Sequence, residues 1–114
     1  MNVYLIQTPG SGVFTPVTAY GVGSRNEVSN RTGLAHLFEH MMFRGTPSYP
    51  VPFKTLSEWG GNFNAYTSFD VTVYFETVPK SLYRDALKFE SERMRKLQIT
   101  PEGYTTERQA VISE

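Results

Sequence analysis

Both histidines of the chain fall within one short run, His36-Leu37-Phe38-Glu39-His40. In an α-helix with about 3.6 residues per turn, His36 and His40 lie one turn apart, and Glu39 falls on the same side within about 100°. Two neutral imidazoles that converge on one point, with a carboxylate beside them, suit a catalytic zinc ion with an open coordination position. The run therefore predicts a zinc site.

A catalytic zinc site needs a third protein ligand, which in this chain must be a carboxylate because there is no other histidine and no cysteine. Glu107 and Glu114 are seven residues apart in a predicted helix, so both project from one face. The spacing does not choose between them. With either ligand, the metal would acidify a water molecule, and Glu39 would take its proton and pass it to the leaving amine. This is amide hydrolysis without a covalent intermediate.

Each of these residues also has an ordinary structural interpretation. A histidine pair one turn apart is commonly a surface or satisfied core feature, and an acid on a helix face is commonly solvated. A purely structural zinc site is disfavoured, because such sites are closed and mostly built from cysteine. The joint presence of His36, Glu39 and His40 in this phase favours a catalytic zinc site.

Composition narrows the class of protein. The chain has 114 residues, enough for one small domain, and its 11 basic and 11 acidic residues give no argument for binding nucleic acid. Without cysteine it has no disulfide framework, and no apolar run approaches the roughly 20 residues of a membrane span. No signal peptide is visible. The location stays open between the cytoplasm and, if a signal has been removed, the periplasm or the exterior.

The pattern of apolar residues predicts an α+β fold, with an antiparallel-rich sheet that packs one face on helices. Thr32 is expected to cap the helix that carries the histidines, which should end after Arg44. Thr100 and Pro101 open the last helix. The other predicted strands or extended segments are 3–6, 13–22, 62–68 and 70–79, and the other predicted helices are 53–59 and 81–97.

Four segments together resemble one family, the pitrilysin-type (M16) zinc metallopeptidases, whose inverted H-x-x-E-H order is that of an inverzincin. Thr32 to Thr46 resembles the zinc-site helix of this family, and 22–27 resembles the segment that leads into it. The run 60–68, Gly-Gly-Asn-Phe-Asn-Ala-Tyr-Thr-Ser, resembles the substrate-binding strand, and 107–114 resembles the helix with the third ligand. The resemblance extends from about Val17 to Glu114.

The resemblance implies roles that spacing leaves open. By the E-x6-E pattern of the family, Glu114 would bind Zn²⁺ with His36 and His40, and Glu107 would be a supporting acid behind a ligand. Asn64 and Ala65 would contact the backbone of a peptide that adds a strand to the sheet. Phe43 and Tyr66 fall where members of the family line the cleft, although both are equally consistent with core aromatics.

The resemblance also implies that 1–114 is a single partial domain, the N-terminal zinc-bearing portion of a zinc metalloendopeptidase acting on extended peptides. The expected partner is a second M16-type half-domain or a further copy of the chain. Glu114 ends the sequence, where ordering a residue costs about 1–2 kcal/mol, so weak zinc affinity and little turnover are expected of these residues alone. The alternative is a catalytically incompetent fragment or partner subunit that captures peptides.

Overall fold

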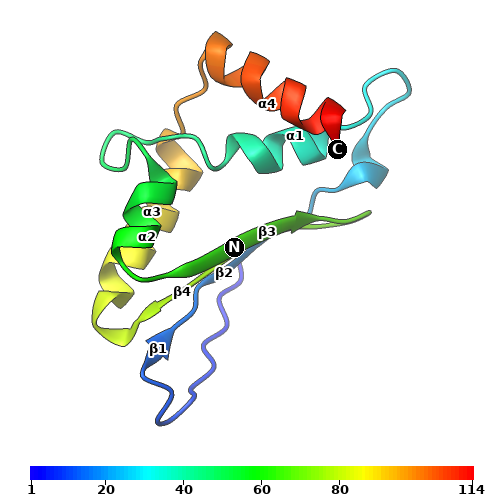
Figure 1. Ribbon diagram of the computed structural model, residues 1–114. Helices are drawn as coiled ribbons and strands as arrows, with labels where there is room; N and C mark the ends of the chain where they lie inside the picture. The colour runs from blue at the N-terminus through cyan, green and yellow to red at the C-terminus, as the bar shows by residue number, and fades with distance from the viewer.

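The computed structural model describes residues 1–114 and has an α+β architecture, as the sequence predicts. No helix in it is both long enough and apolar enough to cross a membrane. Figure 1 shows the order of the elements along the chain. The strands are β1 (Val13–Phe14), β2 (Val17–Tyr20), β3 (Asn62–Thr67) and β4 (Thr72–Pro79), and the α-helices are α1 (Leu34–Met41), α2 (Pro52–Glu58), α3 (Tyr83–Lys96) and α4 (Pro101–Ser113). Two short 3₁₀ helices, η1 (Ser24–Asn26) and η2 (Lys80–Leu82), complete the set.

Strand β4 is the centre of an antiparallel sheet. All of β3 pairs with it, from Asn62 opposite Thr77 to Thr67 opposite Thr72. On its other side it pairs first with β2 and, towards its end, with β1. Strand β3 pairs only with β4, so one edge of β3 has no partner strand. An open edge of this kind can accept another extended chain.

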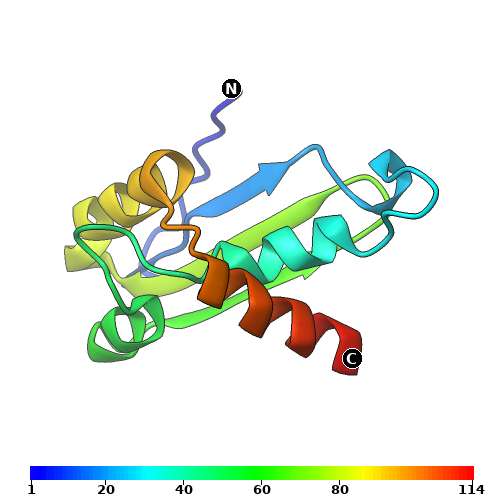
Figure 2. The ribbon, with the colours of Figure 1, turned by 90° about the horizontal axis from the view of Figure 1, so that it is seen from above.

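The helices lie on one side of the sheet and form two levels there. Helix α1 runs above β3, and α4 crosses above α1, so that α1 is between α4 and the sheet (Figure 1). Seen from above, α1 and α4 run beside each other, while α2 and α3 cover the other end of the sheet (Figure 2). This layering brings the C-terminal end of α4 over the helix that carries both histidines.

The hydrophobic core lies where α2, α3 and the loop before α2 meet the sheet. Tyr49, Leu56 and Phe89 form its buried centre, with Trp59 and Phe63 packed against it. The Tyr49 ring meets those of Trp59 and Phe89 edge to face, with centroids 5.9 and 5.2 Å apart. Aromatic pairs in this arrangement add to the gain from burial. The core thus fixes α2 and α3 and leaves α4 outside it.

A buried ionic group lies between β4 and α3. Glu76, Glu90 and Arg93 are each at most 5% exposed, and the Arg93 guanidinium contacts both carboxylates. The same guanidinium lies over the rings of Tyr74 and Phe43, 4.7 and 5.7 Å from their centroids. Two carboxylates share one guanidinium, and burial together with Glu90 raises the pKa of Glu76 to about 9. One acid of the group is therefore kept protonated at neutral pH.

Three local predictions from the sequence are wrong. Residues 3–6 form no strand, and the side chains of Val3 to Ile6 are exposed, because no neighbouring strand pairs with them. The strand predicted at 13–22 is divided into β1 and β2 at Thr15-Pro16, since proline has no N–H to give to the ladder. Thr32 does not cap α1: Gly33 takes that position with a left-handed φ of 87°.

Other predictions are confirmed. Helix α2 begins at Pro52 and stops before Gly60, which has a φ of 68°, and the Gly61 N–H donates back to the Leu56 carbonyl. Helix α4 begins at Pro101 behind Thr100, whose hydroxyl oxygen accepts a bond of 3.0 Å from the Gly103 N–H. Proline, glycine and capping residues set the starts and ends of these helices through contacts within a few residues, so the sequence alone predicts them.

The buried acid predicts a pH dependence of stability. Because the folded pKa of Glu76 is raised to about 9, the folded state holds a proton that the unfolded chain releases above its ordinary value of 4.5. The free energy of unfolding should therefore fall as pH rises from about 5 to about 9. Glu76→Gln, which cannot ionise, should remove most of this fall in urea unfolding at several pH values. The exposed Glu102→Gln is the control, and a wild-type slope in Glu76→Gln would contradict the assignment.

Candidate metal centre

Helix α1 is held at its N-terminus by Glu27. The two oxygens of this carboxylate accept hydrogen bonds of 2.8 Å from the N–H groups of Gly33 and Ala35. They satisfy two of the donors that the first turn of a helix leaves free, and the negative charge suits the positive end of the helix dipole. These bonds hold the pKa of Glu27 below its ordinary value. The helix that carries the histidines is thereby fixed at its start.

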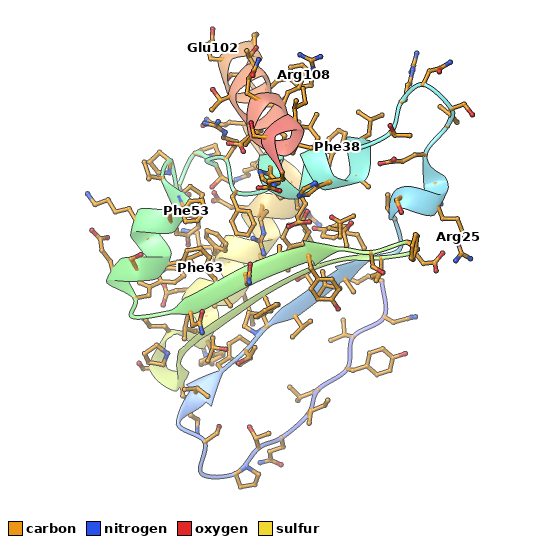
Figure 3. All side chains as sticks on the ribbon, turned by 45° about the vertical axis from the view of Figure 1, so that its right-hand side comes forward. Arg25, Phe38, Phe53, Phe63, Glu102 and Arg108 are labelled. Carbon is orange, nitrogen blue, oxygen red and sulfur yellow. The ribbon has the colours of Figure 1, made fainter.

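The segment that provides Glu27, from Gly23 to Glu27, also forms hydrogen bonds with the turn between β3 and β4. The backbone N–H groups of Ser24 and Arg25 donate to the carbonyls of Ser68 and Phe69 at 3.1 and 2.9 Å. A Cβ on Gly23 would lie 2.3 Å from the Ser68 carbonyl oxygen, so only glycine allows this approach. Figure 3 shows Arg25 at this end of the sheet. The segment therefore sets the position of β3 relative to α1.

Three possible metal-binding atoms converge between α1 and α4. Nε2 of His36 lies 3.1 Å from Nε2 of His40 and 3.1 Å from Oε2 of Glu114, and Nε2 of His40 is 3.6 Å from the same oxygen. All three atoms lie within 4.8 Å of one another. Ligands about 2.0–2.2 Å from a tetrahedral zinc ion are about 3.3 Å apart, which these separations match.

The hydrogen bonds of His40 indicate which of its nitrogens is free. Its Nδ1 lies 3.2 Å from Oε2 of Glu107, and a carboxylate can only accept, so Nδ1 carries the proton. The lone pair of Nε2 then points towards His36 and Glu114. Two imidazole nitrogens and a carboxylate oxygen are the ligand types of a catalytic zinc ion, and a cation among them would offset the repulsion between their lone pairs. The donor set thus fits a divalent cation.

Glu39 lies beside this group but on the side of the sheet. Its Oε2 accepts a hydrogen bond of 2.5 Å from the hydroxyl of Thr67, the last residue of β3. Thr67 in turn pairs with Thr72 on β4, whose hydroxyl donates to the Val22 carbonyl at 2.9 Å. One carboxylate oxygen of Glu39 is therefore fixed, while the other has no hydrogen-bond partner.

A cleft of about 440 Å³ opens next to Glu39 and His40. Phe43 and Phe53 form much of its apolar wall, with ring centroids 5.4 Å apart, and the ring of Phe63 packs against both. Figure 3 shows Phe53 on α2 above Phe63 on β3. Phe43 also lies over buried Arg93, so it is both a core aromatic and a wall of the cleft.

The predicted substrate-binding residues divide between the two faces of β3. Asn64 and Tyr66 are exposed on the face away from the helices, while Ala65 is on the same face as Phe63 and Thr67. The structure does not bring Tyr66, which is 52% exposed, into the cleft. The Ala65 N–H donates to Oδ1 of Asn64 at 2.9 Å, outside the ladder with β4. It therefore faces the open edge of the sheet.

Residues 16–114 match the family model for insulinase, peptidase family M16. The chain belongs to peptidase family M16. Zinc protease PqqE of Helicobacter pylori is 35% identical over 106 residues, which is 91% of this chain and 24% of that protein. M16 relatives of this kind are named zinc proteases, which indicates zinc for the family.

Solved structures agree with the fold. A crystal structure of a protease from Helicobacter pylori superposes with a TM-score of 0.84 and 35% identity over 90% of this chain and 25% of that one. Pitrilysin superposes with a TM-score of 0.80 at 24% identity, covering 90% of this chain and 11% of that one, and shows the shared M16 fold. The chain spans about a quarter or less of the length of these proteins.

Sequence reasoning missed three residues that position the side chains of the candidate site. Glu27 caps α1, Thr67 binds Glu39, and Arg44 binds Glu107 through a contact of 2.6 Å between Nη2 and Oε1. Each signal was present but weak, since a lone acid, threonine or arginine has many possible partners. Only the folded chain shows which partner each residue takes.

The cap on α1 predicts a stability change of known sign. Because the folded pKa of Glu27 is lowered, its contribution is present above the unfolded value of about 4.5 and is lost as pH falls. Loss of a helix cap costs about 1 kcal/mol. Glu27→Gln should therefore lower the free energy of unfolding at pH 7 and flatten its decline below pH 4.5, measured by urea titration.

A matched control for this prediction is Glu58→Gln, whose carboxylate has only an exposed contact of 3.8 Å with Lys54. Exposed pairs of this kind contribute little, so this variant should unfold like the wild type. Equal stability of Glu27→Gln and Glu58→Gln at pH 7 would show that the Glu27 carboxylate does not hold α1.

Proposed function

We propose that this chain carries the metal site of a zinc-dependent endopeptidase, with His36, His40 and Glu114 as the zinc ligands. The observation that supports this most strongly is the convergence of their three donor atoms within 4.8 Å, beside Glu39 and an open cleft. Catalytic zinc sites keep three protein ligands and one open position, whereas structural sites are closed by four. Membership of the M16 family agrees with this function.

Zinc, when bound, supplies Lewis-acid chemistry by acidifying a water molecule and polarising the carbonyl of the substrate. Glu39 is the proposed general base. Its free oxygen would accept the proton of the water and later deliver it to the nitrogen of the leaving amine. Thr67, through its 2.5 Å bond to the other oxygen, limits the rotation of the carboxylate and so keeps Glu39 aimed at the cleft.

Glu107 supports this chemistry without being a ligand. Its Oε2 accepts from Nδ1 of His40 at 3.2 Å, which fixes the tautomer and orients the ring. A carboxylate behind a ligating imidazole also raises its basicity towards the metal. We therefore place Glu107 behind His40 and Glu114 at the metal.

The proposed substrate is a peptide in extended form. The open edge of β3 can accept a further strand, and the outward N–H of Ala65 can bind a peptide carbonyl if the Asn64 side chain moves away. Asn64 and Ala65 are therefore proposed to hold the substrate backbone. Phe43 lines the adjoining cleft and is proposed to contact the side chains of the peptide. A contact between Tyr66 and the peptide is still only a prediction, because Tyr66 lies on the face of β3 that is turned away from the cleft.

Residues 1–114 are proposed to be a partial domain whose peptide chamber is completed by a second M16-type half-domain or another copy. The chain covers only 24% of the length of the zinc protease PqqE that it resembles. The competing hypothesis is a fragment or partner subunit that captures peptides without cleaving them. Retention of His36, Glu39, His40 and Glu114 together favours the catalytic hypothesis, because peptide capture requires none of them.

Metal content tests the site directly. Dialysed against excess zinc, the purified chain should bind about one zinc ion at equilibrium, as three protein ligands allow, with the weak affinity expected of residues 1–114 alone. His40→Ala and Glu114→Gln should hold much less, whereas Glu39→Gln should hold as much as the wild type. A wild type that binds no zinc in equilibrium dialysis against excess zinc would contradict the proposed ligand set.

Peptide hydrolysis separates the two functions. Wild type and Glu39→Gln, both loaded with zinc, are compared on a quenched fluorescent peptide, and peptide binding is measured by anisotropy. Loss of a general base costs on the order of 10²–10⁴-fold in rate, so any turnover should vanish in Glu39→Gln. Equal binding by both proteins with no turnover in the wild type would favour the peptide-capturing hypothesis.

A further inference from the structure

Helix α4 is only lightly buried against the rest of the protein, with Ala110 and Val111 half-buried. Gly103 is its only buried residue, although the helix runs from Pro101 to Ser113. Ile112 is 64% exposed, and Glu102 and Arg108 lie on the outer side of the helix in Figure 3. Helices in proteins are stabilised mainly by packing of an apolar face. This limited burial leaves polar contacts as a large part of what holds α4 above α1.

Arg44 makes two of these contacts at successive turns of α4. Its Nη2 lies 2.6 Å from Oε1 of Glu107 and donates to the Gly103 carbonyl at 3.4 Å. The Gly103 position is close: an added Cβ there would lie 3.6 Å from Nε of Arg44. Arg44 also borders the cleft, in the turn that follows α1. It therefore joins the histidine-bearing helix to the helix that provides both acids.

The Glu107 carboxylate is fixed at both of its oxygens by this arrangement. One oxygen contacts Arg44 and the other contacts Nδ1 of His40, so rotation about the side chain would break one of the two contacts. The side chains of Glu107 and Arg44 are only 19% and 33% exposed, which limits competition from water. A two-sided contact of this kind adds geometric definition to the charge interaction.

From these contacts we infer that Arg44 is a positioning residue for the metal site, acting through Glu107. It holds the Glu107 carboxylate against Nδ1 of His40 and fixes α4 so that Glu114 reaches the two imidazoles. The inference rests on the proposed function, since it assigns a role towards the same metal. The guanidinium of Arg44 would thus strengthen metal binding, although it carries a positive charge like the metal.

The sign of the effect separates this role from simple electrostatics. If Arg44 acted only through its charge, it would repel a divalent cation, and its removal would tighten metal binding. If it acts by holding Glu107, its removal weakens metal binding, because loss of a partner behind a ligand costs about 10–100-fold in metal affinity. The two mechanisms predict opposite changes.

The experiment measures the dissociation constant of Zn²⁺ for the purified chain by competition with a fluorescent chelator. Arg44→Met keeps the apolar stem and removes the charge, and it should weaken binding about tenfold or more. Arg44→Lys keeps the charge without the planar guanidinium, and it should recover only part of the affinity. Arg108→Met removes an exposed arginine from α4 as the control, and screening by salt should keep its effect small.

A double-mutant cycle shows whether Arg44 acts through Glu107. Glu107→Ala should weaken zinc binding, and adding Arg44→Met to it should cost much less than Arg44→Met costs in the wild type. A general structural role of Arg44 would instead give the same cost in both backgrounds. Unchanged or tighter binding in Arg44→Met, or full additivity in the cycle, would overturn the inference.

A second measurement does not depend on zinc. Amide hydrogen exchange of the metal-free protein should show faster exchange across α4 in Arg44→Met than in Arg108→Met, because α4 loses its polar attachment. Equal protection of α4 in the two variants would overturn the role of Arg44. A wild type that binds no zinc while Arg44→Met shows faster exchange would instead reject the metal site and retain the attachment of α4.

Discussion

The proposed metal site depends on how the lightly buried helix α4 is kept beside α1. Helix α4 provides Glu107 and Glu114, yet the hydrophobic core lies under α2 and α3 at the other end of the sheet. Burial therefore contributes little to the position of the two acids. Instead, the contacts of His40 and Arg44 with Glu107 help to hold the two acids in position. These side chains are partly shielded from water, which strengthens their interactions. The groups that form the site also hold its two helices together.

The floor and the rear of the site are more deeply buried than α4. Below the cleft, the buried guanidinium of Arg93 supports the rings of Phe43 and Tyr74 and is held by Glu76 and Glu90. Such a group is costly to bury unless its charges are paired, and here the retained proton on Glu76 reduces the excess of negative charge. The outcome is a fixed aromatic wall next to the proposed general base.

The segment from Gly23 to Glu27 links the turn after β3 to the start of α1. On one side its backbone holds the turn after β3, and on the other Glu27 holds the start of α1. Thr67 and Glu39 lie between these two points, and their short hydrogen bond joins the strand proposed to bind the peptide to the helix proposed to bind the metal. A peptide on the edge of β3 would therefore lie at a set distance from the general base.

The sequence by itself determined the helix with its two histidines, the start of α4 at Thr100 and Pro101, and the extended edge strand, because capping, proline geometry and residue spacing act over a few positions. It also restricted the third ligand to Glu107 or Glu114, and the family resemblance named Glu114. Only the tertiary structure decided that Gly33 rather than Thr32 is the N-cap of α1, with Glu27 accepting from the first N–H groups of the helix. The tertiary structure also decided that residues 3–6 pair with no strand and that Arg44 reaches Glu107. These outcomes depend on partners far away in the chain, and the sequence pattern of a single residue does not contain the distance to its partner.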